Sequence, residues 1–203
     1  MTHQTLKYNH LHGGILKEIS QLTSLEYLRV SCQQSYRCNP QLYKVSSLIR
    51  FVAASNDLQG SIPPDIVITL PNLQGLLLGG NHFDGHIPTT LANASGLHII
   101  DMAENNLRGR VALDLGRLAG LQHINLGENH LEVKNTREWE FLDPLTNCSQ
   151  LEVLVLGDNM LGGMLPNSIG NLSSHLQVLM MGTNKISGRI PYGIGNLANL
   201  GSI

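Results

Sequence analysis

The amino-acid sequence predicts an α/β solenoid, in which short parallel strands form one inner sheet and loops or short helical turns lie outside. Three observations support this class. An asparagine-centred unit recurs about every 24 residues along the chain. Each unit contains a brief L-x-L alternation, which is typical of a short strand. The composition is 42% hydrophobic but only 4% aromatic, so leucine occupies the core positions that rings often fill.

The strand is the first element of each unit. The full unit reads L-x-x-L-x-L-x-x-N-x-L-x-G-x-I-P, as at Leu151, Leu154, Leu156, Asn159, Leu161, Gly163, Leu165 and Pro166. The L-x-L step has a period of two, so one face of the strand is expected to be buried. A strand of three or four residues is not stable alone, and stacking against its copies at about 4.8 Å would stabilise it. The inward row should include Leu126, Leu156 and Met181.

The turn after the strand carries the recurring asparagine. It occurs at Asn9, Asn56, Asn81, Asn105, Asn129, Asn159 and Asn184, with Gln33 in its place in the second unit. An amide has both a donor and an acceptor, so it can satisfy the backbone groups of a tight inward turn. We therefore predict a structural role. Glycine four residues later, as at Gly163, permits a sharp turn, and proline, as at Pro166, fixes φ and ends the local strand.

The G-x-I-P that follows the asparagine resembles the plant-type leucine-rich repeat of receptor kinases, receptor-like proteins and polygalacturonase-inhibiting proteins. The resemblance covers nearly the whole chain and implies a leucine-rich-repeat horseshoe with strands on the concave face. The enlarged unit NHLEVKNTREWEFLDPLTNCSQLEVLVLGDN is similar to the pattern-recognition branch, which includes the rice bacterial-blight resistance receptor. Trp139 and Phe141 of this unit are expected to pack against the outer wall.

The expected organisation is a single domain over residues 1–203, with about eight repeats and neither terminal cap. The first residues lack the apolar segment of a secretory signal, and no stretch approaches the roughly 18 apolar residues of a membrane span. The motifs of a protein kinase are absent, so the resemblance implies no phosphoryl transfer by this chain. We expect a non-enzymatic, truncated product whose open ends expose core leucines and associate.

The candidate ligand surface consists of the x positions of the strands and the residues that follow them. The candidates on neighbouring units are Asp101, Glu104, His123, Asn125, Glu128 and Asp158. Clustered carboxylates favour a cationic partner group, such as an N-terminal amine or a Lys or Arg side chain. The alternative is a solvated acidic surface that only improves solubility.

A column of small residues lies two positions before the asparagine. Its members are Ser31, Ala54, Gly79, Ala103, Gly127, Gly157 and Gly182. Small side chains would let an extended peptide lie close to the sheet. The alternative is that glycine relieves crowding at the turn, and the sequence leaves both interpretations open.

Three N-x-S triplets share one phase of the repeat. They begin at Asn93, Asn147 and Asn171, which are candidate glycosylation sites on the convex side. The alternative is that this phase favours asparagine as a turn or cap, since Asn196 keeps the asparagine without the serine.

The remaining reactive residue types form no catalytic or metal-binding constellation, and no cofactor is expected. Cys148 aligns with core positions and is expected to be a buried thiol. Whether Cys32 and Cys38 pair stays open, because their separation does not fix the geometry. His82 and His86 are separated by a predicted turn and not by one turn of a helix, which argues against a metal site.

The net charge of −2 provides no basic field, which disfavours nucleic acid as a partner. The resemblance implies recognition of a peptide or microbial pattern at the extracellular side of the plasma membrane, in plant defence signalling. A peptide or protein ligand and a co-receptor kinase are the implied partners. A secreted inhibitor similar to polygalacturonase-inhibiting proteins and a non-functional gene fragment are the alternatives. The genomic sequence downstream would separate them.

Overall fold

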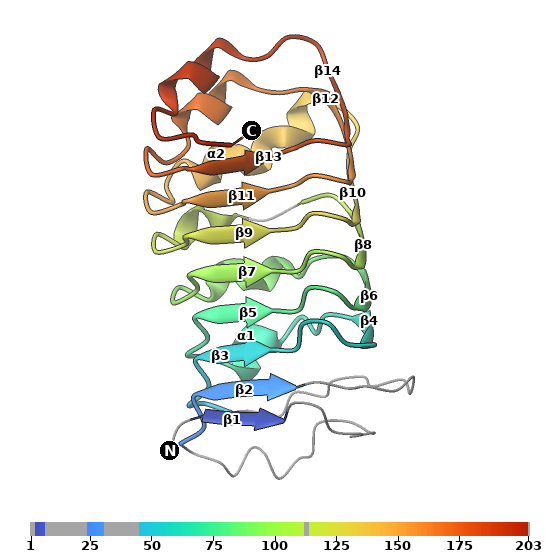
Figure 1. The fold of residues 1–203 in the computed structure, drawn as a ribbon, viewed down its shortest axis with the longest axis vertical. Coiled ribbons are helices and arrows are strands. Elements are labelled where there is room, and N and C mark those ends of the chain that lie inside the picture. The colour runs from blue at the N-terminus through green and yellow to red at the C-terminus, as the bar shows by residue number, and fades with distance from the viewer. Residues whose placement is uncertain (1–2, 7–23, 31–44, 112–113, 203) are drawn as a thin grey trace.

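A parallel sheet of eight short strands runs along the solenoid in the computed structural model, which describes residues 3–6, 24–30, 45–111 and 114–202 (Figure 1). The strands follow one another in sequence order, and they are β1 (His3–Leu6), β2 (Tyr27–Val30), β3 (Arg50–Val52), β5 (Gly75–Leu77), β7 (Ile99–Asp101), β9 (His123–Asn125), β11 (Val153–Val155) and β13 (Val178–Met180). The predicted α/β solenoid is confirmed. The expectations for Asn9, Ser31, Cys32, Gln33 and Cys38 concern residues outside the described ranges.

The leucine rows form a continuous core because the strands pair in register. Ile124, Leu154 and Leu179, the central residues of three successive strands, are partners in the sheet and are at most 1% exposed. Leu126 and Leu156 are equally buried, and Met181 packs against the same core cluster. The predicted inward row is therefore confirmed.

A second parallel sheet, which the sequence analysis did not predict, follows the asparagines of the six described coils from Asn56 to Asn184 (Figure 1). Its six strands are β4 (Gln59–Ser61), β6 (His82–Gly85), β8 (Asn106–Gly109), β10 (His130–Val133), β12 (Met160–Met164) and β14 (Lys185–Ser187). Leu107 of β8 is buried between two exposed residues, and Leu131 of β10 is buried between exposed His130 and half-buried Glu132. The x-L-x step was thus a second strand signal, and the expectation of loops and helical turns alone was incomplete.

Short helical turns return the chain from the second sheet to the long sheet, as predicted. They are α1 (Ile66–Thr69), α2 (Leu142–Leu145) and 3₁₀ turns at Thr89–Asn93, Leu115–Arg117, Thr136–Phe141, Asn167–Asn171 and Tyr192–Asn196. The last two turns approach so closely that a Cβ on Gly170 would overlap the backbone of Gly193. Glycine is therefore required at Gly170 by packing between coils.

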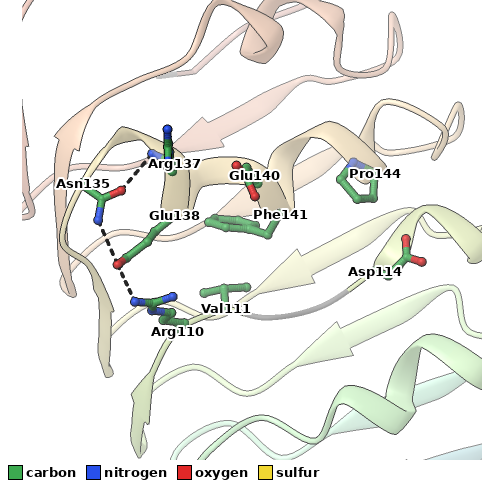
Figure 2. Close-up of a pocket in the computed structure, with 9 residues that line it drawn as sticks. All are labelled: Arg110, Val111, Asp114, Asn135, Arg137, Glu138, Glu140, Phe141 and Pro144. Atoms are coloured by element: carbon green, nitrogen blue, oxygen red, sulfur yellow. Dashed lines mark hydrogen bonds and ion pairs between the residues drawn. The ribbon is translucent and has the colours of Figure 1, made fainter.

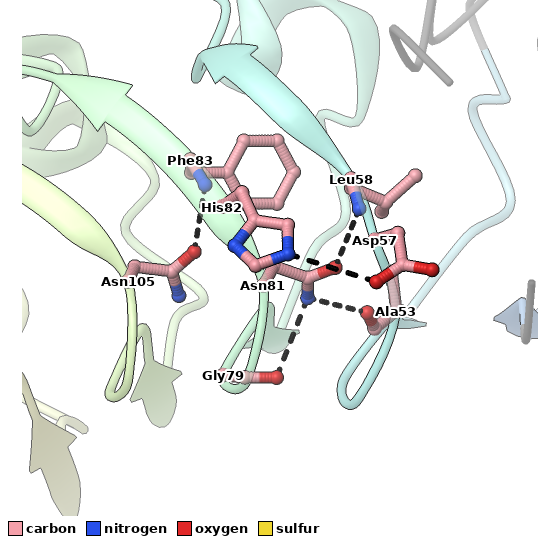
Figure 3. A network of polar contacts seen from close by, with 8 residues as sticks. All are labelled: Ala53, Asp57, Leu58, Gly79, Asn81, His82, Phe83 and Asn105. Atoms are coloured by element: carbon pink, nitrogen blue, oxygen red, sulfur yellow. Dashed lines mark hydrogen bonds and ion pairs between the residues drawn. The ribbon is translucent and has the colours of Figure 1, made fainter. Parts of the chain in front are cut away.

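The recurring asparagines form a hydrogen-bonded ladder between coils (Figure 3). The side-chain amide of Asn81 donates to the Ala53 carbonyl at 2.8 Å, and its Oδ1 accepts the Leu58 N–H at 3.1 Å. One coil later, Asn105 Oδ1 accepts the Phe83 N–H at 2.9 Å. Both asparagines are buried, so the side chains supply partners to backbone groups that water does not reach. The predicted structural role is confirmed.

The enlarged unit places its indole against the second sheet. Trp139 is fully buried, and its Nε1–H donates to the carbonyl of Gly162 in β12 at 2.9 Å. Its ring stacks on Phe141 with centroids 5.7 Å apart. The two rings pack against the solenoid as predicted, and the surface that Trp139 contacts is the second sheet at β12.

Candidate functional site

The exposed face of the long sheet is built from side chains that lie in register. Asp101, Asn125, Val155 and Met180 are the last residues of β7, β9, β11 and β13, and each pairs with the next across the sheet. His123 opens β9 and belongs to a different column. The column that ends the strands therefore changes along the sheet from polar to apolar.

The chain turns sharply just before each ladder asparagine. Glu104, Glu128, Asp158 and Thr183 occupy this corner with φ between 51° and 53°. This left-handed conformation is uncommon for residues other than glycine, and Gly80 fills the same corner one coil earlier with φ 66°. The corner places successive carboxylates at the edge of the exposed face, because the backbone conformation repeats from coil to coil.

A groove of about 390 Å³ crosses the carboxyl ends of β7, β9, β11 and β13. It is lined by Ala103, Glu104, Asn125, Gly127, Glu128, Val155, Gly157, Asp158, Met180, Gly182 and Thr183. We call this the strand-end groove. Four rungs at about 4.8 Å span about 14 Å, which is the length of about four extended residues.

The groove contains four of the six candidate ligand-binding residues: Glu104, Asn125, Glu128 and Asp158. Asp101 and His123 are not among its lining residues. The Oδ1 of Asp101 instead accepts the backbone N–H of Ala103 at 3.2 Å, so this carboxylate caps its own turn.

Three lining residues were missed by the sequence analysis: Val155, Met180 and Thr183. Each occupies a phase that an identified candidate occupies one or two coils earlier. Aligning the units by phase would have found them, whereas selecting charged residues did not.

Four members of the small-residue column, Ala103, Gly127, Gly157 and Gly182, form the floor of the strand-end groove, and crowding accounts for glycine at two of them. A Cβ on Gly127 would lie 3.2 Å from Val155 Cγ1, so glycine there relieves crowding. A Cβ on Gly157 would lie 3.3 Å from the carbonyl oxygen of Gly182, so space is limited there as well. That the column is a path for an extended peptide stays a prediction.

The strand-end groove is acidic on one side and apolar on the other. Glu104, Glu128 and Asp158 form its acidic rim, and Val155 and Met180 form its apolar wall. Within the described residues, none of the three carboxylates makes an ion pair, and no basic side chain lines the groove. A ligand group with a positive charge is therefore favoured at this rim.

A second cavity, of about 570 Å³, lies beside the enlarged unit (Figure 2). Arg110 reaches Glu138 at 2.7 Å, and the same carboxylate accepts the Lys134 N–H at 2.7 Å and the Asn135 amide at 3.0 Å. The Glu138 side chain is only 6% exposed, and these contacts compensate its burial. The network fixes the enlarged unit onto the preceding coil.

The three triplet asparagines Asn93, Asn147 and Asn171 are all exposed, on or directly after the helical turns away from the long sheet. Ser173, the hydroxyl residue of the third triplet, is buried, and its Oγ donates to the Ser149 carbonyl at 2.7 Å.

Cys148 is buried as predicted, and its Sγ lies 3.3 Å from the Leu115 carbonyl. Burial raises the pKa of this thiol to about 11. His82 begins β6 and His86 directly follows this strand, so the two histidines are separated by a strand where a turn was predicted. The Nε2 of His82 is 3.6 Å from an Asp57 carboxylate oxygen. The described residues contain no group of three or more His, Cys, Asp or Glu that could hold a metal ion.

Comparison with known proteins agrees with this architecture. The family model "Leucine Rich Repeat" matches residues 72–94, 150–172 and 175–197. The receptor kinase-like protein Xa21 of Oryza sativa subsp. japonica is 51% identical over 43 residues, which are 21% of this chain and 4% of that protein. The chain therefore spans a small part of this relative's length.

Two solved structures are similar over almost the whole chain. The plant peptide hormone receptor RGFR1, in complex with RGF2, has a TM-score of 0.84 and 30% identity, covering 97% of this chain and 30% of that one. The ectodomain of the Arabidopsis thaliana membrane receptor kinase GASSHO1/SCHENGEN3, in complex with CASPARIAN STRIP INTEGRITY FACTOR 2, has a TM-score of 0.80 and 32% identity, covering 94% and 22%.

Within the described residues, no helix combines the length and the apolar character that crossing a membrane requires. The repeats, the parallel strands and these similarities identify the chain as a leucine-rich-repeat solenoid of the type found in the ectodomains of plant receptor kinases.

Proposed function

We propose that the chain is a ligand-binding region of a plant receptor-kinase-like protein and recognises a peptide at the extracellular side of the plasma membrane. The observation that carries this proposal is the strand-end groove, which crosses four rungs and is long enough for about four extended residues. The similar RGFR1 and GASSHO1/SCHENGEN3 structures are complexes with RGF2 and CASPARIAN STRIP INTEGRITY FACTOR 2, which supports a ligand of this class. Defence signalling is the role implied by the resemblance of the enlarged unit to the pattern-recognition branch of the receptor kinases.

The acidic rim selects the ligand. Glu104, Glu128 and Asp158 stand on successive coils without basic partners in the described structure. A Lys or Arg side chain, or an N-terminal amine, would relieve their mutual repulsion. Asn125 adds a side-chain amide, because its Oδ1 is engaged by the Gly127 N–H at 3.2 Å and its Nδ2 is left to donate to the ligand.

Binding of the ligand would create a composite surface for a co-receptor kinase. HAESA, a similar Arabidopsis receptor kinase with a TM-score of 0.66 and 24% identity, was solved with the peptide hormone IDA and the co-receptor SERK1. Its likeness to this chain concerns the fold, and the co-receptor step is part of our proposal. Glycans on Asn93, Asn147 and Asn171 would lie on the helical turns and leave the groove open.

A peptide-capture experiment tests the proposal. The immobilised full chain is exposed to a library of acetylated, amidated hexapeptides with one position fixed at a time, and the captured peptides are identified by mass spectrometry. We expect enrichment of peptides with Lys or Arg. The double variant Glu128→Lys/Asp158→Lys should capture them about tenfold less, because each exposed ion pair contributes about 0.2–1 kcal/mol and tenfold corresponds to about 1.4 kcal/mol.

Two control variants separate charge from folding. Glu128→Gly removes one carboxylate while keeping the left-handed corner, since Gly80 occupies the same corner one coil earlier. Glu140→Lys makes the same charge change on the exposed side of the enlarged unit, outside the strand-end groove. Equal capture by the wild type and the Glu128→Lys/Asp158→Lys variant would refute the proposal.

A further inference from the structure

The floor of the strand-end groove contains backbone donors whose availability differs from coil to coil. The N–H of Ala103 donates to Asp101 Oδ1, and the N–H of Gly127 donates to Asn125 Oδ1, both at 3.2 Å. Each cap comes from the residue two positions earlier, at the end of the strand. The strand-end side chain therefore decides whether the N–H behind it is occupied.

Two coils in the groove lack this cap. Val155 and Met180 occupy the strand-end position before Gly157 and Gly182. The Val155 side chain has no acceptor, and Met180 offers only a weakly accepting thioether sulfur. Within the described part of the chain, the N–H groups of Gly157 and Gly182 donate no hydrogen bond. The residues on either side of Gly157 do donate, since the Leu156 N–H bonds the Met180 carbonyl at 2.7 Å and the Asp158 N–H bonds the Gly182 carbonyl at 2.9 Å.

Gly157 is the more informative of the two because the residue as a whole is buried, whereas Gly182 is exposed. Buried backbone N–H groups are almost always paired, and an unpaired one requires an explanation. The Gly127 N–H, one coil earlier, is reached by a side chain on the exposed face of the sheet. By the same backbone geometry, the Gly157 N–H is directed toward this face, at the floor of the groove.

We propose that the Gly157 and Gly182 N–H groups donate to backbone carbonyl oxygens of an extended peptide lying across the strand-end groove. The Val155 and Met180 side chains that leave these donors free also contact an apolar side chain of the peptide. A basic side chain of the same peptide reaches Glu128 and Asp158. This inference rests on the proposed function and specifies how the ligand is held.

The two ends of the strand-end groove therefore recognise different parts of the peptide. One end, at Asn125 and Glu128, recognises side chains, because its backbone donor at Gly127 is already occupied. The other end, at Gly157 and Gly182, recognises the peptide backbone. Peptides with an apolar residue beside the basic residue should be favoured, since Met180 is 44% exposed and Val155 is half-buried beside it.

The inference is tested by substitutions that give the Gly157 N–H an acceptor side chain of the protein itself. Val155→Asn is expected to cap the Gly157 N–H as Asn125 caps Gly127. Val155→Ala shortens the apolar wall but leaves the donor free. Leu77→Asn makes the matched change at the same column of β5, where Gly79 lies outside the groove. All three full-length variants are probed with the hexapeptides captured by the wild type.

We expect Val155→Asn to bind these peptides about fivefold more weakly than Val155→Ala, since the net contribution of one hydrogen bond corresponds to about a fivefold change in affinity. Leu77→Asn should bind as the wild type does. In ¹H–¹⁵N spectra, the Gly157 amide should shift downfield when the peptide is added. Equal affinities of the Asn and Ala variants, or an unmoved Gly157 amide, would overturn this inference while leaving peptide binding intact. Capture of no peptide by the wild type would overturn both proposals.

Discussion

Replacing one buried ladder asparagine should destabilise the solenoid by an amount that the contacts define. In Asn129→Ala, the Leu107 N–H loses the Oδ1 acceptor that lies 3.0 Å away. The carbonyls of Met102 and Leu126 lose the amide donor at 3.0 and 3.2 Å. Asn129 itself is 5% exposed, so water does not readily replace these contacts.

The three backbone groups that lose a partner in Asn129→Ala are not affected equally. The Met102 carbonyl still accepts from Asn105 at 3.2 Å, and the Leu126 carbonyl still accepts from Asn159 at 3.0 Å. The Leu107 N–H has the largest loss, and leaving a buried donor unsatisfied costs about 1–3 kcal/mol. With the weakened carbonyl contacts, we expect Asn129→Ala to lower the free energy of unfolding by about 2–4 kcal/mol.

Asn184→Ala is the matched control. Asn184 makes the same type of contacts, accepting the Leu161 N–H at 2.9 Å and donating to the Leu156 and Met181 carbonyls at 3.0 Å. Because Asn184 is only half-buried, water can reach the groups it leaves. We expect its loss to cost about 1 kcal/mol, near the net contribution of an ordinary hydrogen bond.

Urea unfolding of the full chain measures both variants. Far-ultraviolet circular dichroism follows the sheets, and the fluorescence of Trp139, the single tryptophan, follows the coils beside Asn129. Coincident transitions from the two probes would justify a two-state analysis, which repeat proteins do not always obey. Equal costs for Asn129→Ala and Asn184→Ala, or a cost below about 1 kcal/mol at Asn129, would refute the reasoning.

Two further predictions concern the enlarged unit. Trp139→Phe keeps an aromatic ring but removes the donor to the Gly162 carbonyl, so we expect the melting temperature by circular dichroism to fall by about 2–6 °C; an unchanged value would contradict this. The raised pKa of Cys148, about 11, predicts about a hundredfold slower alkylation at pH 8 than an ordinary thiol shows, measured on the Cys148 peptide by mass spectrometry. The folded chain keeps this proton between about pH 9 and 11 while the unfolded chain releases it, so stability should fall with rising pH in this window, and less so in Cys148→Ala.

The fold could be predicted from the sequence where the same residue type recurs at the same position of every unit, because such a residue has the same structural role in each coil. Asn81 and Asn105 were identified as structural because each coil repeats the same backbone requirement, and the ladder contacts match this reasoning. The second sheet was missed although Leu107 and Leu131 carry its signal, because a strand of four residues with only one or two buried side chains resembles a turn until the neighbouring units are aligned.

The candidate site could be predicted from the sequence only in part. Charge identified Glu104, Glu128 and Asp158, but it also selected Asp101, whose carboxylate caps its own turn. Val155 and Met180 carry no charge. In our proposal they matter because they leave the N–H groups of Gly157 and Gly182 without a side-chain acceptor. Whether a backbone donor is free depends on the side chain two residues earlier and on the coil beside it.

The sequence by itself determined the coil, its period and its buried row, because these follow from local periodicity and from the repeated needs of one backbone turn. Only the tertiary structure decided which positions on adjacent coils converge into the strand-end groove and which N–H groups remain open at its floor. The physical reason is that residues about 24 positions apart become neighbours only when the coils stack in register.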